Sequence, residues 1–233
     1  MLLRNDDVAA GIARAWDAEY ASGKYEDEPP IPFTRAILDT LRERGLLVAR
    51  GLYVGCGNGR NYIPLAAVCV GLRGIDVSGA GLQQLLSKAP GFAGRVSCKD
   101  FLSVSPDAPL DYIISIRAFQ HGDGQTARRY LEHAAAVLRP GGLLFLRVNS
   151  ARTDIYRRHQ VIEKNSLGGL TIRYDDGPKA GLPVHFFTDR ELEYRLHLAG
   201  FDVLGDPDEA SEERRPLETG TWRQWELVAV RHQ

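Results

Sequence analysis

Three glycines at alternate positions form the segment of this 233-residue chain that is best suited to hold a ligand. The segment Gly55-Cys56-Gly57-Asn58-Gly59 stands between an apolar run and an amphipathic run. Glycine lets the backbone turn sharply and lets a ligand approach without collision with a Cβ atom. A dinucleotide loop needs a third glycine where Arg60 stands, and a P-loop needs Gly-Lys-Ser/Thr. The sequence therefore excludes both of these loop types.

Acidic residues follow the next two predicted strands. Asp76 lies 21 residues after Gly55, where the second strand is expected to end. A carboxylate at that place accepts hydrogen bonds from a ribose 2′,3′-diol. Its alternative role is to cap the following helix, but Ser78 already offers that cap. After the third strand, Asp100 suits the exocyclic amine of an adenine and Phe101 suits its ring.

The elements that position these residues follow from the alternation of short apolar runs with amphipathic runs. That pattern predicts an α/β fold with a parallel sheet and crossover helices. Strands are expected at 46–54, 71–77, 94–99, 110–116, 143–148, 201–204 and 225–230, with hairpin strands around 169–174. Helices are expected at 7–20, 32–45, 61–68, from 78, 126–138, 154–163 and 188–200. The charged segment 206–219 is expected to be either a lid or a disordered surface loop.

Composition narrows the class of protein. The chain has 29 Lys and Arg against 30 Asp and Glu, a net charge of −1, which argues against a nucleic-acid partner. No apolar run reaches the roughly 18 residues of a spanning helix, and the first residues do not resemble a signal peptide. The cysteines Cys56, Cys69 and Cys98 form neither a metal motif nor a disulfide framework. We therefore expect a cytoplasmic protein without a membrane partner.

Taken together, these features resemble a class I S-adenosylmethionine (SAM)-dependent methyltransferase. The resemblance rests on the glycine loop, Asp76, Asp100-Phe101, the segment Leu138-Arg-Pro-Gly-Gly and the last pair of strands. It implies a doubly wound, Rossmann-like, seven-stranded mixed sheet in the order 3-2-1-4-5-7-6, with helices on both faces. It also implies a single domain over 1–233, in which N-terminal helices at 1–45 cover the cofactor site. Segments 151–187 and 206–219 would be substrate-side insertions.

A finer resemblance is to the tellurite-resistance and thiopurine methyltransferase branch. It rests on the loop Gly55-Cys-Gly-Asn-Gly-Arg-Asn, on Trp16-Asp-Ala-Glu-Tyr20 and on Phe186-Phe-Thr-Asp-Arg-Glu-Leu192. One departure from the wider family is Tyr53, which stands where an acidic residue usually helps to organise the methionine end of SAM.

The resemblance implies a set of residues that bind the cofactor SAM. Gly55, Gly57 and Gly59 would line its methionine and ribose portion, Asp76 would hold the ribose diol, and Asp100 with Phe101 would hold the adenine. Trp16 and Tyr20 share a helix face and either cover the cofactor or anchor the N-terminal helix to the core. The remaining members of the expected set are Cys56, Asn61, Val77 and Arg117.

Residues after the fourth strand, 116–121, would face the methyl acceptor. His121 is the first choice for a polar group on that side, with a structural hydrogen bond as the alternative, and His185 is the second. Arg117 would steer an anionic acceptor, or form a salt bridge to a neighbouring helix. The other histidines, at 133, 159, 197 and 232, show no metal-ligand spacing, so we expect no metal.

The function that these observations favour is methyl transfer from SAM to an O, N or S/Se/Te atom of a small molecule, by a monomer or homodimer. The segment Ile116-Arg-Ala-Phe does not match the Asn/Asp-Pro-Pro-Tyr/Phe motif of methylases that act on exocyclic amines of bases. Two alternatives stay open. One is a non-catalytic SAM- or nucleoside-binding module, and the other is a protein or RNA methyltransferase that relies on a partner for recognition.

Overall fold

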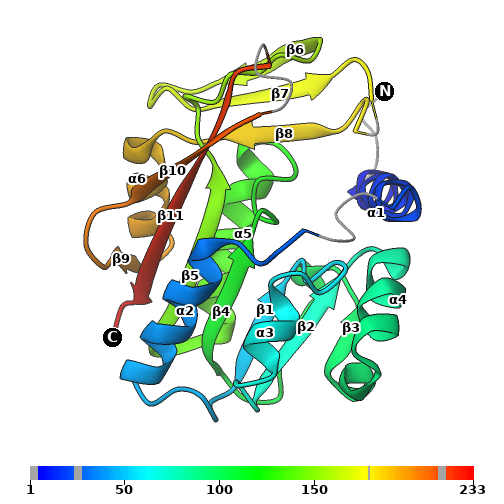
Figure 1. The fold of residues 1–233 in the computed structure, drawn as a ribbon. Coiled ribbons are helices and arrows are strands. Elements are labelled where there is room, and N and C mark those ends of the chain that lie inside the picture. The colour runs from blue at the N-terminus through cyan, green and yellow to red at the C-terminus, as the bar shows by residue number, and fades with distance from the viewer. Residues whose placement is uncertain (1–4, 24–27, 178, 215–218) are drawn as a thin grey trace. The chain divides into compact units, whose positions relative to one another are not determined.

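A computed structural model describes residues 5–23, 28–177, 179–214 and 219–233. Its helices are α1 (Asn5–Ala21), α2 (Pro32–Glu43), α3 (Tyr62–Ala66), α4 (Gly79–Lys88), α5 (Gly124–Val137) and α6 (Asp189–Leu198), with short 3-10 helices at Pro90–Arg95 and Phe101–Ser103. Its strands are β1 (Gly51–Val54), β2 (Leu72–Asp76), β3 (Val96–Cys98), β4 (Leu110–Ile116), β5 (Leu138–Asn149), β6 (His159–Lys164), β7 (Leu170–Tyr174), β8 (Pro183–Phe186), β9 (Phe201–Val203), β10 (Asp208–Glu213) and β11 (Thr221–Arg231). Figure 1 shows these elements along the chain.

The main sheet confirms the predicted α/β class and strand order. Its strands run β10-β11-β5-β4-β1-β2-β3, and β9 also pairs with β11. The β1–β2 and β2–β3 pairs are parallel, whereas β11 is antiparallel to β5 and to β9. The predicted sixth and seventh strands are therefore β9 and β11, and the sheet is the mixed, Rossmann-like type that the sequence indicated.

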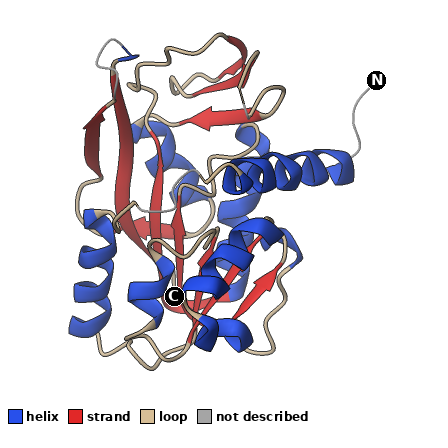
Figure 2. Cartoon of the chain, turned by 45° about the vertical axis from the view of Figure 1, so that its right-hand side comes forward, coloured by secondary structure: helices blue, strands red, loops and turns tan. Residues whose placement is uncertain are grey.

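Two predicted elements are wrong. Segment 154–163 is not a helix, because residues 159–164 form β6, which pairs with β7 in a separate antiparallel sheet of order β6-β7-β8 (Figure 2). Pairing along a neighbouring strand has overridden the local helical pattern. The predicted loop 206–219 contains β10, which continues the main sheet beyond β11. Residues 215–218 of that loop lie outside the described residues.

Element boundaries differ at two further places. Residues 46–50 form turns ahead of β1, although the apolar run suggested strand. The segment Arg139-Pro-Gly-Gly142 belongs to the beginning of β5, so the strand follows α5 directly. Proline still ends the helix, since α5 stops at Val137.

The chain divides into two compact units, residues 1–114 and residues 115–233. The expectation of a single domain over 1–233 stays a prediction. In the first unit, α2 begins at Pro32 and buries Phe33, Ile37 and Leu41, the predicted face. Ser78 caps α4, since its hydroxyl accepts a hydrogen bond from Gly81 N at 3.0 Å. Helix α1 packs against α4 (Figure 1).

In the second unit, both long helices begin at side-chain caps. Asp123 accepts a hydrogen bond from Thr126 N at 2.8 Å at the start of α5, and Thr188 accepts one from Glu191 N at 3.1 Å at the start of α6. The small sheet buries an apolar cluster formed by Ile172, Val184 and Phe186. None of the helices among the described residues has the length and apolarity that crossing a membrane requires.

Candidate active site

The glycine loop follows β1 and is held against β2. The backbone N–H groups of Gly55 and Cys56 both donate to Ile75 O, at 2.9 and 3.1 Å. Gly57 has φ +49° and a Cβ atom there would lie 2.0 Å from the Tyr20 hydroxyl oxygen. Gly59 also has positive φ, +84°. These two positions need glycine for the left-handed backbone and for the close approach of a protein side chain, Tyr20 at Gly57 and Ile63 at Gly59. The close approach of a ligand to the loop stays a prediction.

Asp76 ties the glycine loop to the end of β2. Its carboxylate is 8% exposed and accepts hydrogen bonds from Gly57 N at 2.7 Å and from Ser78 N at 2.8 Å. Burial raises the pKa of the Asp76 carboxyl, and the backbone donors of Ser78 and Gly57 oppose that rise. The backbone N–H of Val77 acts in the same direction. Because a carboxylate offers about four acceptor positions, these backbone donors leave room for a ligand hydroxyl.

Helix α1 lies over this loop. Two of its residues at the loop, Trp16 and Tyr20, were predicted from the sequence, and a third, Asp17, was not. Tyr20 contacts Gly57 and Gly81, and its ring centroid lies 5.9 Å from that of Trp16. Asp17, which sequence reasoning missed, accepts hydrogen bonds through Oδ1 from Ser78 Oγ at 2.7 Å and from Ala80 N at 3.0 Å. No local pattern marks Asp17, because its partners lie about 60 residues away in the sequence. These contacts bring the predicted residues Trp16 and Tyr20 to the glycine loop.

Tyr53, Cys56 and Asn61 form the inner wall behind the loop. Tyr53 is 2% exposed, and its side chain is hydrogen-bonded to that of Asn61. Burial raises the pKa of both the Tyr53 phenol and the Cys56 thiol well above their ordinary values, so both groups are neutral. The Asn61 side-chain oxygen also accepts from Ile31 N and Thr34 Oγ, each at 3.0 Å. Asn61 therefore connects the loop to the start of α2.

Asp100, Phe101 and Val77 lie at the ends of the neighbouring strands. Asp100 follows β3 and caps the short helix Phe101–Ser103, accepting from Leu102 N at 2.9 Å. Phe101 is buried, at 3% exposed, and Val77 is half-buried directly after β2. The carboxyl ends of β1, β2 and β3 thus carry the predicted residues, in the arrangement that open α/β sheets use for ligands.

In the second unit, Arg117 follows β4 in a strained backbone conformation. It has φ 63°, and it is the one non-glycine residue with positive φ among those described. Its guanidinium carbon lies 3.8 Å from the centroid of the Trp222 ring, a cation–π contact. Strain of this kind persists where the surrounding structure holds it and is frequent at functional sites.

His121 lies four residues further on and is neutral. Burial, with the positive charges of Lys179 and Arg117, lowers the pKa of His121 to about 3. Its Nε2 atom is shielded from solvent. The backbone fixes the residue, because His121 N donates to Ala118 O at 3.1 Å and His121 bridges to Val184 of β8. A histidine with this pKa is a poor general base at neutral pH but a usable hydrogen-bond partner.

A buried polar network around Asn149 was not predicted. Its side-chain oxygen accepts from Trp222 Nε1 at 3.1 Å and from Gln224 Nε2 at 3.3 Å, and its backbone N donates to Gln120 Oε1 at 2.8 Å. The network fixes the indole on which Arg117 stacks. No motif marks these residues in the sequence, because the contacts join positions that are 29 to 75 residues apart.

His185, the second candidate, belongs to a separate buried cluster. Its Nδ1 lies 2.8 Å from Thr171 Oγ1, and its Nε2 lies 3.0 Å from Glu191 Oε1. The Thr171 hydroxyl donates to Glu163 at 2.7 Å, so it must accept from His185 Nδ1. Nε2 faces the Glu191 carboxylate, so each ring nitrogen of His185 has a hydrogen-bond partner. His185 is fully buried and holds β7, β8 and α6 together.

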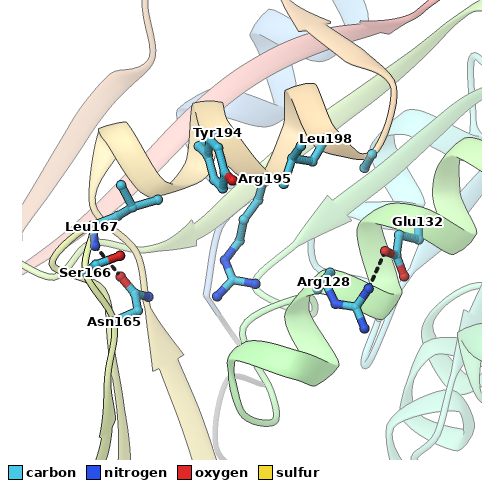
Figure 3. Close-up of a pocket in the computed structure, with 9 residues that line it drawn as sticks. Arg128, Glu132, Asn165, Ser166, Leu167, Tyr194, Arg195 and Leu198 are labelled. Carbon is cyan, nitrogen blue, oxygen red and sulfur yellow. Dashed lines mark hydrogen bonds and ion pairs between the residues drawn. The ribbon is translucent and has the colours of Figure 1, made fainter.

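A pocket of about 440 Å³ lies beside this cluster, between α5, α6 and the turn after β6. Figure 3 shows Arg128 and Glu132 on α5 facing Arg195 on α6. The Arg195 guanidinium is already engaged by Glu191 at 2.6 Å and by Gly124 O at 2.9 Å, and Arg128 by Glu132 at 2.7 Å. The pocket contains none of the predicted site residues.

The strand order, the glycine loop after β1 and the acidic residue that ends β2 together define the fold of the class I SAM-dependent methyltransferases. Residues 52–142 match the family described as a methyltransferase domain. This match identifies a SAM-dependent methyltransferase domain in the chain, with SAM as the methyl donor. No curated protein matches the chain significantly.

Several solved structures share the fold. The 1,6-didemethyltoxoflavin N1-methyltransferase of Burkholderia thailandensis, bound to 1,6-didemethyltoxoflavin and S-adenosylhomocysteine, is 20% identical, with a TM-score of 0.72 over 100% of this chain and 92% of its own. The N-methyltransferase NodS of Bradyrhizobium japonicum, bound to S-adenosylhomocysteine, is 16% identical, with a TM-score of 0.62 over 96% and 100%. The magnesium protoporphyrin IX methyltransferase of Synechocystis, bound to SAM, is 18% identical, with a TM-score of 0.57 over 85% and 78%.

Proposed function

We propose that this enzyme transfers the methyl group of SAM to an O, N or S/Se/Te atom of a small molecule. The observation that carries the proposal is the buried Asp76 carboxylate bonded to the glycine loop beneath Tyr20. Two further observations support a small acceptor. Three proteins that share the fold act, by their names, on a toxoflavin precursor, on a porphyrin and as an N-methyltransferase. The net charge of −1 also does not favour nucleic acid.

The residues of the first unit fit the cofactor. Asp76 would accept hydrogen bonds from the ribose diol with the acceptor positions that Gly57 and Ser78 leave open. The loop backbone at Gly55–Gly59 would lie against the methionine and ribose portion, since positive φ at Gly57 and Gly59 keeps Cβ atoms away. Asp100 and Phe101, with Val77, would hold the adenine.

Methyl transfer needs little chemistry from the protein. The bound cofactor supplies a methyl group on a sulfonium, so displacement releases a neutral leaving group. Side chains then contribute by orienting the acceptor and by excluding water. His121, with a pKa of about 3, would not take a proton at neutral pH. We therefore expect an acceptor atom that carries a lone pair without the help of a strong base, such as a thiolate, an acidic ring nitrogen or a chalcogen anion.

Arg117 would set the charge preference of the acceptor. Its stacking on Trp222 fixes the plane of the guanidinium, which favours planar, bidentate contact with an anionic group. Lys179 adds a second positive charge near His121. An acceptor with a negative charge or a delocalised anion fits these groups better than a cation does.

The finer assignment to the tellurite-resistance and thiopurine branch is part of the same proposal. It rests on Trp16 and Tyr20, which lie at the glycine loop, and on the segment Phe186–Leu192, which leads into α6. The acceptors for which that branch is named are soft nucleophiles, which agrees with the low pKa of His121.

Two measurements test the proposal. Calorimetry with SAM and S-adenosylhomocysteine should show binding, and no binding at millimolar concentration would refute it. Transfer of a labelled methyl group should then be followed over a panel of thiols, phenols, nitrogen heterocycles and chalcogen anions. Binding without turnover on any acceptor would favour a non-catalytic module. A co-purifying macromolecule that is required for turnover would favour a protein or RNA methyltransferase.

A further inference from the structure

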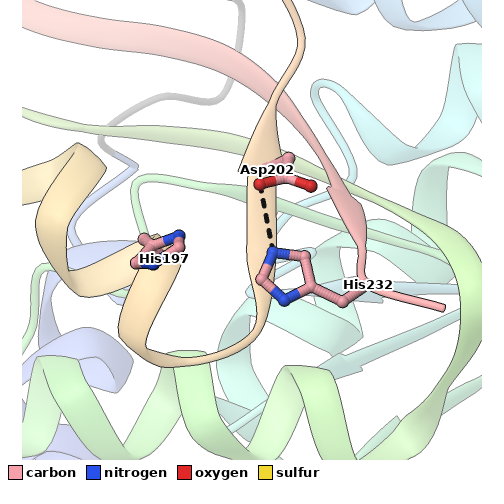
Figure 4. Close-up of side chains that lie close together, drawn as sticks. All are labelled: His197, Asp202 and His232. Carbon is pink, nitrogen blue, oxygen red and sulfur yellow. Dashed lines mark ion pairs between the residues drawn. The ribbon is translucent and has the colours of Figure 1, made fainter.

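Three potential metal ligands from three different elements converge in the second unit. His197 lies in the last turn of α6, Asp202 lies in β9, and His232 directly follows β11. One ligand atom from each lies within 4.8 Å of the other two. Figure 4 shows the three side chains grouped at one place, with the ion pair between Asp202 and His232. Their spacing in the sequence gave no sign of this cluster.

The backbone holds these residues together. Gly200, with φ +88°, ends α6 and allows the chain to turn at once into β9. Strand β9 pairs with β11 so that Phe201 is opposite Arg231. The next residue, His232, donates its backbone N–H to Gly200 O at 2.9 Å. The position of each ligand therefore follows from main-chain hydrogen bonds and does not depend on the side chains themselves.

The side-chain geometry is close to that of a coordination sphere. His232 Nε2 and Asp202 Oδ1 are 3.1 Å apart. In a tetrahedral site with metal–ligand distances of about 2.0–2.1 Å, neighbouring ligand atoms are roughly 3.3 Å apart. The His197 and His232 rings are 5.8 Å apart between centroids and inclined at 63°, so they are not stacked face to face. His197 is exposed, and its ligand nitrogen lies within 4.8 Å of the ligand atoms of Asp202 and His232.

We propose that His197, Asp202 and His232 bind one divalent transition-metal ion, for which Zn²⁺ is the best match. An ion pair alone explains the contact between Asp202 and His232, but it gives no role to the second imidazole beside them. Two imidazoles and one carboxylate favour Zn²⁺, Co²⁺ or Ni²⁺ over Mg²⁺ and Ca²⁺, which prefer oxygen ligands. Water would complete the coordination. The bound ion would link the end of β11 to α6 and β9, and it would stabilise this part of the fold by binding only the folded state.

The test is a titration of the full chain with ZnCl₂ at neutral pH, followed by calorimetry and by the melting temperature. The background should be Cys98→Ser, since that exposed thiol could bind zinc on its own. We expect one ion per chain and a higher melting temperature with Zn²⁺ than with Mg²⁺. His197→Ala, Asp202→Asn and His232→Ala should each weaken binding at least tenfold.

His159→Ala is the matched control, because it removes a histidine of the small sheet, on β6, whose Nδ1 lies 2.7 Å from the Arg157 carbonyl oxygen. It should leave zinc binding unchanged. No binding of Zn²⁺ at millimolar concentration would overturn the proposal, and so would equal affinity in His197→Ala and the parent. Circular dichroism of each variant separates a lost site from a lost fold. S-adenosylhomocysteine binding, measured with and without a chelator, reports on the methyltransferase separately.

Discussion

Replacing Asp76 by Asn tests whether this carboxylate both supports the glycine loop and holds the cofactor ribose. The carboxylate accepts from Gly57 N and from Ser78 N, at 2.7 and 2.8 Å, one bond to each oxygen. The asparagine side chain keeps one acceptor oxygen and turns an NH₂ group toward the other donor. One buried backbone N–H group then loses its acceptor, which costs about 1–3 kcal/mol of folding free energy.

The effect on the cofactor comes in addition. Hydrogen bonds from a diol to a charged acceptor contribute about 1.5–3 kcal/mol. Since 1.4 kcal/mol is a factor of ten in affinity, Asp76→Asn should weaken S-adenosylhomocysteine binding by roughly 10- to 150-fold.

The assay combines calorimetry with S-adenosylhomocysteine and denaturant unfolding of the same variant. Asp111→Asn is the matched control, because Asp111 Oδ2 also accepts a backbone N–H, from Arg50 at 2.9 Å, but does so away from the glycine loop. The control should lose some stability and keep its affinity. If folded Asp76→Asn binds S-adenosylhomocysteine as tightly as the parent does, the assignment of Asp76 to the ribose is refuted.

Three other substitutions give independent tests. Gly57→Ala should lower both stability and cofactor affinity, because φ is +49° and the new Cβ would lie 2.0 Å from the Tyr20 hydroxyl. Thermal melting should show a smaller loss of stability when Gly57→Ala is made in a Tyr20→Ala background. Because the pKa of His121 is about 3, protonation of this group should not change kcat/KM of the wild-type enzyme between about pH 5 and 8. A change of kcat/KM with pH in that range that His121→Gln removes would contradict the structure. Burial raises the pKa of Glu191, but the hydrogen bonds and charges of His185 and Arg195 outweigh burial and hold the pKa below its ordinary value. The ionised Glu191 therefore stabilises the fold above pH 4.5, and this contribution is lost as the pH falls. Glu191→Gln should therefore destabilise the fold at pH 7, because Arg195 loses its carboxylate partner, and it should flatten the acid limb of stability in urea unfolding.

The sequence predicted those parts of the fold that depend on local pattern. Strand β4, the cap at Ser78 and the start of α6 each have a cause within a few residues. The strand order followed from the resemblance, and the structure confirms it. Strand β10 and the β6-β7-β8 sheet were missed, because polar strands of this kind form through pairing with a distant neighbour and show little periodicity of their own.

The candidate site also contains residues that a local pattern marks and residues that only distant contacts bring into place. Gly57 and Asp76 were predictable, since each must have its particular chemistry at a fixed distance from the end of a strand. Asp17 and the Asn149 network were not, because their hydrogen-bond partners lie 29 to 75 residues away. The start of α6 shows both kinds of contact. The Thr188 side chain accepts a hydrogen bond from Glu191 N, which is a local contact. The Glu191 carboxylate binds His185 and Arg195, and the contact with His185 forms only because β8 packs against α6.

Tyr53 shows how the site can hold a charged ligand without the acidic residue that the wider family places there. The Tyr53 side chain lies near Asp76 and Cys56, and its pKa is raised chiefly by burial. A carboxylate at this position would face the Asp76 charge across a buried region, where like charges repel strongly. The phenol avoids that repulsion, stays neutral and is fixed by Asn61. Asp17 is then the carboxylate that acts on Asp76, and its Oδ1 is already engaged by Ser78 and Ala80, so we expect the loss of affinity in Asp76→Asn to remain measurable.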